Sequence, residues 1–478
     1  MPQNLINVLK SFTFNYRFQL IKTIKKIANK LGIDRAISYV LMGRGFSFFS
    51  QPITLYLIAK YFTAPEQGYY YTFGSILSAS IFLELGLGVV LTQFASHEYA
   101  YLSWNADGSL SGDKDSLSRL LSILRKSLKW YGVLSVLFFL ILIPVGIIFF
   151  GSSPDTTNIN YLTPWIFLVF FNSFGLFIYP ILTIIEGCGR VADIQKMKFY
   201  QLSIGAVSVW LIIFMNGGLL AASILAFTNF LVSIIWLHNN FKGLVLQLRL
   251  SDNKFNYHQI SWRREIMPMQ WRIALSWISG YLIYQLFNPL LFKYQSATVA
   301  GQMGMSISVA NVVLGTSMAW ISTKTPLYGS FIKKKHYKDL DKLALKSSSQ
   351  AVFFSVVLSV AAVIFVYYIK AYFPHYGQRI LSTAAIAALL FSNIINVVIT
   401  AMAGYLRAHK EEPYLVNSLI GAVLTSVIAW TCAKYYNADI LCYAIAANNL
   451  LIGLPLAIYI FKKKRIDWGI EKIKFEQV

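Results

Sequence analysis

The sequence predicts an all-α polytopic membrane protein with twelve transmembrane helices in two lobes of six. Three observations carry this prediction: an apolar composition, long apolar runs that recur along the chain, and an alternation of basic loops with nearly uncharged ones. Hydrophobic residues make up 56% of the 478 residues and charged residues only 13%, whereas soluble domains carry roughly 25% charged residues. A soluble enzyme or soluble binding module is thereby excluded.

Each predicted helix is an apolar run long enough to cross a membrane, because a hydrocarbon core of ~30 Å needs about 20 helical residues at 1.5 Å each. The fifth and sixth runs are separated only by the turn Asn216-Gly217-Gly218. In chain order the runs cover residues 36–61, 68–96, 128–150, 161–186, 199–215, 218–239, 266–292, 297–323, 348–370, 380–405, 413–433 and 439–461.

The positive charges identify the side of the membrane on which the termini lie. The net charge is +22, and almost all Lys and Arg residues fall in alternate segments: before the first run, in every second loop and after the last run. The loops on the other side hold only Lys60, Lys293, Lys370, Arg379 and Lys434. Basic loops stay on the cytoplasmic side, so both termini are predicted to be cytoplasmic. The charge then suits membrane lipids as partners and predicts no nucleic-acid binding.

Signals for metal, cofactor or catalytic chemistry are weak. Cys188, Cys432 and Cys442 are scattered without a CxxC pair or a cluster with histidines, so no disulfide, metal site or cofactor is predicted. The DLD at Asp339 to Asp341 lies in the charged stretch KKKHYKDLDK. We expect it on a solvated helix face rather than in a nucleotide-sugar site.

Short sequence patterns recur between the two halves and predict an internal duplication. KYFTAPEQG begins at Lys60 and KYQSATVAG at Lys293, with Lys, Tyr, Ala and Gly at matching positions. GCGR at Gly187 and GYLR at Gly404 follow the fourth and tenth runs. Two six-helix halves that start on the same side are related by an axis along the membrane normal. The predicted organisation is an amphipathic N-terminal segment at 1–35, a first lobe at 36–242, a linker at 243–264, a second lobe at 265–463 and a tail at 464–478.

Arg44 is the one cation deep in the first run, within LMGRGFSFFS, and Glu84 is the acid in the second run. A charge at the bilayer centre costs ~2.5–3.5 kcal/mol on insertion scales, so such residues face a bundle interior or a watery cavity. The two residues are equally far from the turn at Ala64, which predicts similar depths in an antiparallel hairpin. Two interpretations stand. The residues form a buried ion pair, or they line a transport cavity in which Arg44 contacts an anion and Glu84 tunes it or binds a coupling ion.

Further polar residues inside the runs are candidates for the same cavity. Arg272, in QWRIALSW, either snorkels to the interface or faces Arg44 and helps to hold a diphosphate in bidentate fashion. Amide side chains suit sugar hydroxyls but also hydrogen-bond between membrane helices. The amide candidates for cavity contacts are Gln51, Asn172, Asn311, Asn393 and Asn396.

Several stretches resemble bacterial polysaccharide-biosynthesis flippases of the Wzx type, within the multidrug/oligosaccharidyl-lipid/polysaccharide exporter superfamily. They are FFSQPITLYLIAKYFTAPEQGYYYTFGSILSASIFLELGLGVVLTQFASHE, IEGCGRV, ISGYLIYQLFNPLLFKYQSATVAGQMGMS and STKTPLYGSFIKKK. Where the family most often has Leu-Gly in the first turn, this chain has Thr63-Ala64. The resemblance implies a MATE-like, V-shaped transporter in the bacterial inner membrane and no enzymatic activity.

The resemblance also implies a cargo and partners. The cargo is an undecaprenyl-diphosphate-linked oligosaccharide, moved to the periplasmic leaflet by alternating access, with Arg44 and Arg272 as the matching cavity cations. A polysaccharide polymerase and a chain-length regulator, as in O-antigen synthesis, are the implied protein partners. Two alternatives remain: a cation-coupled multidrug exporter of the same superfamily, which favours an acidic cavity, and a membrane-embedded polymerase or glycosyltransferase, which needs a large outward loop or a nucleotide-sugar domain.

Overall fold

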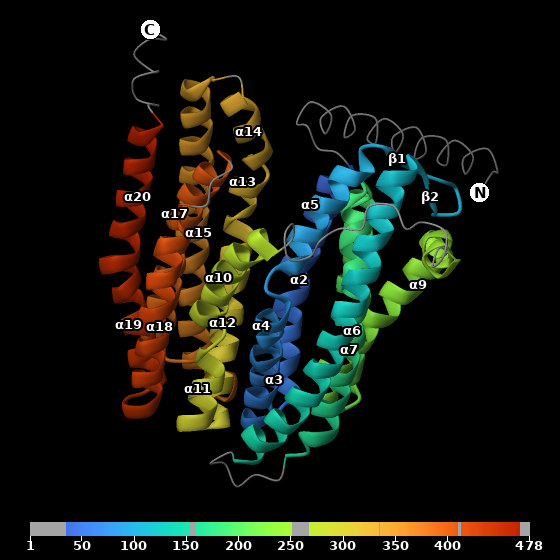
Figure 1. The fold of residues 1–478 in the computed structure, drawn as a ribbon. Coiled ribbons are helices and arrows are strands. Elements are labelled where there is room, and N and C mark those ends of the chain that lie inside the picture. Colours follow the sequence, from blue (N-terminus) through green and yellow to red (C-terminus); the bar gives the residue numbers. More distant parts are fainter. Residues whose placement is uncertain (1–34, 153–158, 251–266, 334, 410–412, 469–478) are drawn as a thin grey trace, which may run out of the picture.

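A computed structural model describes residues 35–152, 159–250, 267–333, 335–409 and 413–468. The predicted amphipathic segment, except Arg35, and most of the linker and tail lie outside these residues. Figure 1 shows two groups of roughly parallel helices, one from each half of the chain. We call the end that carries the start of α2 and the end of α20 the basic face, and the other end the opposite face.

The first lobe is built from the elements between Arg35 and Leu250. Its helices are α2 (Arg35–Tyr61), α3 (Ala64–Leu77), the 3-10 turn η1 (Ser78–Ser80), α4 (Ile81–Glu84), α5 (Leu87–Tyr99), α6 (Lys114–Gly151), α7 (Leu162–Gly187), α8 (Val191–Phe214) and α9 (Leu220–Leu250). Its two strands are β1 (Leu102–Trp104) and β2 (Leu110–Gly112).

The second lobe follows the same plan with more interruptions. It contains α10 (Met267–Tyr284), α11 (Phe287–Tyr294), α12 (Ala297–Ser317), α13 (Ala319–Ser322), α14 (Thr325–Lys333), α15 (Tyr337–Tyr372), α16 (Pro374–Gly377), α17 (Thr383–Arg407), α18 (Leu415–Tyr435), α19 (Ala438–Asn448), the π-helical η3 (Asn449–Gly453) and α20 (Leu454–Asp467).

Each of the twelve predicted runs falls on a helix or on a broken helix. Within the described residues, nine helices are long and apolar enough to span a membrane, and the bent pair α3–α4 and α5 makes ten. Of the two remaining runs, one is α2, which carries Arg44, and the other is the interrupted pair α10 and α11. The predicted all-α, two-lobed membrane fold is confirmed, with the addition of one short hairpin.

The second predicted helix is not straight. Leu85 and Gly86 have φ angles of 50° and 69°, a left-handed conformation that stops an α-helix. The chain bends there by 49° between α4 and α5. A Cβ on Gly86 would overlap the side chain of Ile273 on α10, so glycine serves both the backbone conformation and the close approach of the second lobe.

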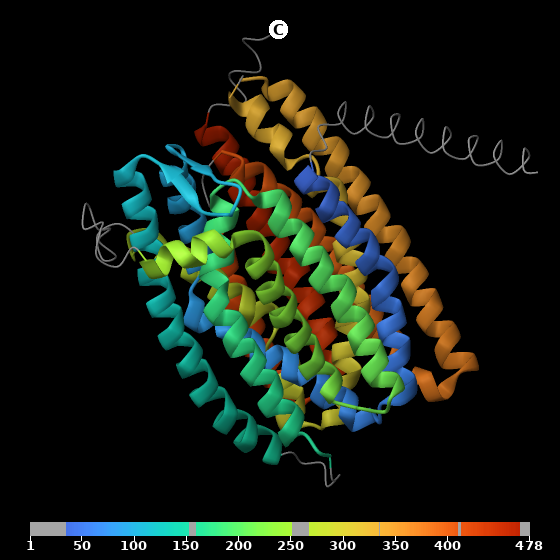
Figure 2. The same ribbon diagram turned by 90° about the vertical axis from the view of Figure 1, so that its right-hand side faces the viewer.

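An antiparallel hairpin stands on the basic face between α5 and α6, where the sequence predicts only a loop. Leu102 pairs with Gly112 and Trp104 with Leu110. The side-chain amide of Gln247 holds the hairpin through two hydrogen bonds. Its Oε1 accepts from the N–H of Leu110 at 3.0 Å, and its Nε2 donates to the Leu110 carbonyl at 2.9 Å. Gln247 is in place because α9 kinks at Phe241 and continues beside the hairpin (Figure 2). Helix α9 therefore extends into the predicted linker.

Asp341 of the DLD sequence is not on a solvated face. Its carboxylate receives two hydrogen bonds from the Arg465 guanidinium, at 3.1 and 2.9 Å, and one from the Tyr405 hydroxyl at 2.8 Å. The Asp341 and Arg465 side chains are only 18% and 17% exposed. Asp339 is exposed as predicted. The prediction for Asp341 is wrong because its partner Arg465 lies 124 residues away in the sequence, where no local pattern reveals it.

The two lobes touch most closely through α3 and α12 near the opposite face. A Cβ on Gly68 would overlap the Ala297 carbonyl, and a Cβ on Gly301 would lie 2.8 Å from the Gly68 nitrogen. The buried Gln67 side chain donates from Nε2 to the carbonyls of Gly301 (2.8 Å) and Arg379 (2.9 Å). The Arg379 guanidinium in turn donates to the Phe62 carbonyl at 2.6 Å. These contacts close the opposite face between the lobes.

We expect Gly68→Ala to weaken this closure, because its methyl group would overlap backbone atoms that cannot move aside cheaply. Overpacking of this kind costs about 1–3 kcal/mol. The variant should show a lower thermal unfolding temperature in detergent than the unmodified protein. Gly74→Ala, on the same helix, is the matched control, since a Cβ there meets no atom within 4 Å. Equal unfolding temperatures for the two variants would contradict the close packing.

Candidate functional site

A cavity of about 550 Å³ lies between the lobes. Helices α2, α3, α8 and α9 of the first lobe and α12 of the second form its walls. Its described lining residues include amides, hydroxyls and one cation but no carboxylate. The polar and charged members are Ser50, Gln51, Thr54, Tyr70, Tyr71, Lys198, Gln201, Asn229, Ser308 and Asn311. We call this space the central cavity.

Hydrogen bonds between helices fix the polar wall of the central cavity. Gln201 on α8 donates from Nε2 to the Asn229 carbonyl at 3.0 Å and to the Ser233 hydroxyl at 2.9 Å, both on α9. Trp210 Nε1 donates to the Thr54 hydroxyl on α2 at 2.8 Å. Both Gln201 bonds use its amide nitrogen, so the wall is ordered without its amide oxygen.

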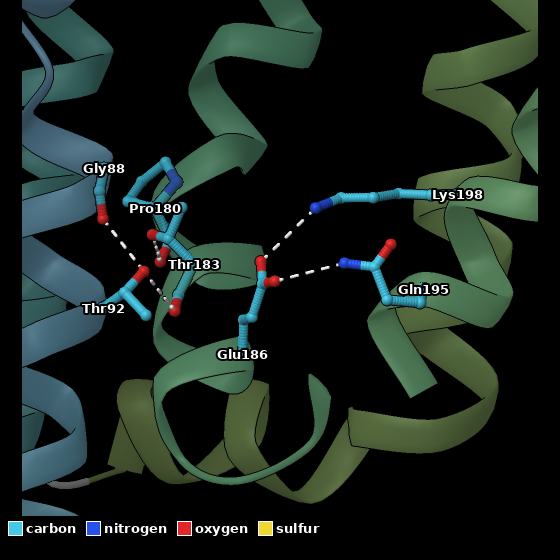
Figure 3. A network of polar contacts seen from close by, with 7 residues as sticks. All are labelled: Gly88, Thr92, Pro180, Thr183, Glu186, Gln195 and Lys198. Carbon is cyan, nitrogen blue, oxygen red and sulfur yellow. Dashed lines mark hydrogen bonds and ion pairs between the residues drawn. The ribbon is translucent and has the colours of Figure 1, made fainter. Parts of the chain in front are cut away.

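The turn between α7 and α8 positions the cationic side of the cavity. Gly187 ends α7 where a Cβ would overlap the Thr92 carbonyl oxygen on α5, and Thr92 donates to the Thr183 carbonyl at 3.3 Å. Gly189 then takes a φ of 78°, which reverses the chain. The last turn of α7 and the first two turns of α8 consequently face each other across this turn (Figure 3).

Glu186 on α7 and Lys198 on α8 form an ion pair across that turn. Lys198 Nζ lies 3.4 Å from Glu186 Oε2, and Gln195 Nε2 donates to Glu186 Oε1 at 3.4 Å. The Lys198 side chain is half exposed and the Glu186 side chain a quarter exposed. Such a solvated pair is worth at most about 1 kcal/mol. An anion in the central cavity can therefore compete with Glu186 for Lys198.

Arg44 lies on α2 above the central cavity, on the side of the basic face. It shares a helix face with Gln51, seven residues later, which lines the cavity. Its guanidinium donates to the Ser322 hydroxyl on α13 at 2.7 Å and so bridges the two lobes. A guanidinium has five N–H donors, and the Arg44 side chain is partly exposed. The bond to Ser322 uses one nitrogen of this group, Nη1.

Glu84 does not meet Arg44. It lies in the first lobe beside a separate cavity of about 340 Å³, which Asn172 and Tyr179 also line. The buried Tyr131 donates its hydroxyl to Glu84 Oε1 at 3.4 Å. The predicted ion pair fails because α2 packs against α8 whereas α3 packs against α12, and because the bend at Leu85 ends the straight hairpin that the depth estimate assumes.

The structure divides the other predicted residues among different places. Gln51 and Asn311 line the central cavity. Asn172 lines the Glu84 cavity while its Nδ2 donates to the Leu168 carbonyl of its own helix at 2.8 Å. Asn393 on α17 donates to the Ala310 carbonyl on α12 at 2.9 Å, the structural role of a helix tie.

Two predicted residues remain without an assigned contact. Asn396 is half-buried on α17 and lines neither cavity. Arg272 is on α10, and its side chain lies outside the described part of the structure. The proposed role of Arg272 as a second cavity cation stays a prediction.

Lys198 is the main site residue that the sequence does not single out. The sequence places it in a cytoplasmic loop ending near residue 198, but α8 begins at Val191 and carries Lys198 two turns into the helix. Gln201 lies three residues later on the same helix face. A lysine and an amide at this spacing are typical of one polar face of a helix and could have indicated that the helix starts before residue 199.

No family model and no curated protein matches the chain, but solved structures match its fold. An inward-facing multidrug resistance MATE family transporter of the MOP superfamily covers 92% of this chain and 99% of its own length, with 14% identity and a TM-score of 0.60. The chain has the MATE fold. The MATE multidrug transporter DinF-BH, solved as a complex, matches 92% of this chain and 96% of its own, with 16% identity and a TM-score of 0.59. An outward-facing MATE family transporter matches with a lower TM-score of 0.53.

We expect a cysteine in the central cavity to be labelled from the basic face. When the Gln51→Cys variant is reconstituted in vesicles, a membrane-impermeant maleimide should label it much faster from the basic face. The contacts of Gln67 and Arg379 close the cavity at the opposite face. Tyr436→Cys, exposed beyond the end of α18, is the control with the reverse preference. The native cysteines are buried, and burial raises the pKa of Cys188 to about 12, which keeps it an unreactive thiol. Equal labelling of Gln51→Cys from both faces would contradict the closure.

Proposed function

We propose that this protein is a flippase that moves an undecaprenyl-diphosphate-linked oligosaccharide from the cytoplasmic to the periplasmic leaflet of a bacterial inner membrane by alternating access. The basic face is then cytoplasmic. The observation that carries the proposal is the chemistry of the central cavity: amides, hydroxyls and Lys198, with Arg44 above it and no carboxylate among its described lining residues. Amides and hydroxyls suit a glycan, and the two cations suit a diphosphate.

The position of the cations supports a headgroup that enters from the basic face. A diphosphate and glycan cannot cross hydrocarbon unaided, because burying unpaired polar and charged groups is costly. The central cavity offers replacement hydrogen bonds between the lobes while the lipid tail stays in the bilayer. Its volume of about 550 Å³ lies in the range of roughly 300–1,000 Å³ typical of ligand sites. It accommodates the diphosphate and the first sugars, with the rest of the glycan toward the entrance.

The Glu84 cavity supports one alternative, a cation-coupled multidrug exporter. The structural neighbours are multidrug transporters by description, and an acid beside a cavity in the first lobe suits a cation. Within our proposal, the same residue serves as the site of a coupling proton or sodium ion. A drug-sized cation in the central cavity would instead meet Lys198 without a lining carboxylate, which disfavours the alternative.

We expect Arg44→Gln and Lys198→Gln to slow the flipping of a labelled lipid-linked oligosaccharide in reconstituted vesicles. Each removes a hydrogen bond to a charged group, worth about 1.5–3 kcal/mol, so the loss should be roughly 10- to 100-fold. Lys196→Gln is the matched control, because Lys196 is on the same helix but faces Tyr200 and does not line the cavity. Full activity of both cavity variants would refute the diphosphate role.

Glu186→Gln should act in the opposite direction to Lys198→Gln. It removes the acidic partner of Lys198 and leaves the cation free for the diphosphate, so substrate binding should tighten. Transport of a cationic dye in the same vesicles distinguishes the multidrug exporter from the flippase. If this protein exports drugs, dye transport should be lost in Glu84→Gln and kept in Lys198→Gln, whereas no dye transport by the unmodified protein supports the flippase.

A further inference from the structure

A second large cavity, of about 670 Å³, lies on the outer surface where the two lobes meet. Helix α6 of the first lobe forms one wall and α10 of the second lobe the other, and Leu85, at the bend between α4 and α5, also lines the space. Helix α10 packs against both α4 and α5, and Ile273 lies against Gly86 there. We call this space the seam groove.

The seam groove lies at the boundary between the hydrocarbon and the basic face. Lys126 and Lys129 line it, and the segment of α6 that follows, from Trp130 to Gly151, contains no charged residue. At 1.5 Å per residue that segment is about 33 Å long, close to the ~30 Å of a hydrocarbon core. The two lysines are therefore at headgroup depth. Trp130 and Trp271, on the two walls, are 45% and 54% exposed, as is typical of side chains at a membrane interface.

The chemistry of the groove changes with depth. Lys126 and Lys129 line it three residues apart on one helix face, and Lys126 already takes part in a polar or charged contact. Its deeper part is mostly apolar, with Leu85, Val133 and Ala274, and Gln270 is its one amide among the described lining residues. No carboxylate is among its described lining residues. A cationic rim above an apolar slot is complementary to an amphiphile with an anionic head and a hydrocarbon chain.

We propose that the seam groove binds one anionic phospholipid of the leaflet on the basic face. The headgroup phosphate contacts Lys129 and competes with the present partner of Lys126 for that second lysine. One acyl chain lies between Trp130 and Trp271 along Val133 and Ala274. The transported lipid is a separate species, because neither lysine lines the central cavity, where Arg44 and Lys198 provide the cations. The proposal does not depend on the cargo.

A lipid in this position also affects the arrangement of the lobes. The two walls of the seam groove belong to different lobes. A lipid that contacts both walls therefore favours the arrangement seen here over any in which α6 and α10 separate. A ligand shifts such an equilibrium by its difference in affinity for the two states. Anionic lipid in the basic-face leaflet is thereby expected to stabilise the state that is closed at the opposite face.

Native mass spectrometry of the full chain, released from membranes of phosphatidylglycerol and phosphatidylcholine, tests the site. Phosphatidylglycerol should remain bound to the unmodified protein, and K126Q/K129Q should retain it about 5- to 25-fold less well. The lower figure counts Lys129 alone and the upper one counts both lysines, at about 1 kcal/mol per lysine near an anionic headgroup and 1.4 kcal/mol per tenfold. K462Q/K463Q, on exposed lysines of α20, makes the same change of charge elsewhere. An equal loss in this control would overturn the proposal.

A second pair of variants tests the acyl chain without changing charge. Val133→Trp fills the groove, whereas Val136→Trp, at a similarly exposed position of the same helix (57% against 54%), does not line it. Only Val133→Trp should lose the retained lipid and the crosslink of a diazirine-acyl phosphatidylglycerol to α6 and α10. Retention by Val133→Trp would overturn the proposal. Displacement of the probe by undecaprenyl diphosphate, with no displacement by phosphatidylglycerol, would overturn it in favour of the transported lipid.

Discussion

The contact between α3 and α12 is the constraint on which the rest of the structure depends. Gly68 and Gly301 allow two helix backbones to meet without side chains between them. Gln67 and Arg379 then bridge the lobes with three hydrogen bonds to backbone carbonyls. At about 0.5–1.5 kcal/mol each, these bonds amount to a few kcal/mol. A ligand that binds the two states with different affinity can shift an equilibrium by this much. The hydrogen bonds therefore stabilise the closed arrangement without preventing its opening.

The same two helices also border the central cavity, through Tyr71 of α3 and Asn311 of α12. The helix sides that face this cavity carry Gln51 from α2, Gln201 from α8 and Asn311 from α12. Transport by alternating access would require the lobes to separate where Gly68 meets Gly301 and to approach near Arg44, which already contacts Ser322 of the other lobe.

The membrane fold could be read from the sequence because hydrocarbon thickness and apolar run length are directly linked. The repeated KYFTAPEQG and KYQSATVAG patterns also have a physical explanation. Their glycines, Gly68 and Gly301, lie against each other, so one packing requirement, the close approach of two helix backbones, acts on both positions. The breaks at Leu85 and before Phe287 were not predicted, although Gly86 follows the first and Pro289 follows the second, because the sequence on both sides stays apolar enough to suggest one continuous helix.

The site was predicted only in part, because contacts between lobes leave no local pattern. Arg44, Gln51 and Asn311 were found as polar residues in apolar runs, but the partner of Arg44 is 278 positions away. Lys198 was missed since helix α8 starts earlier than its hydropathy suggests. The electrostatics of the cavity follow from these partners. Ser322 is neutral and leaves the charge of Arg44 uncompensated by that contact, whereas Glu186 offsets Lys198 at the cost of a weak, solvated pair. In the proposed flippase, a diphosphate that reaches both cations would have to displace an acid only at Lys198, so Arg44 would be the stronger anchor of the two.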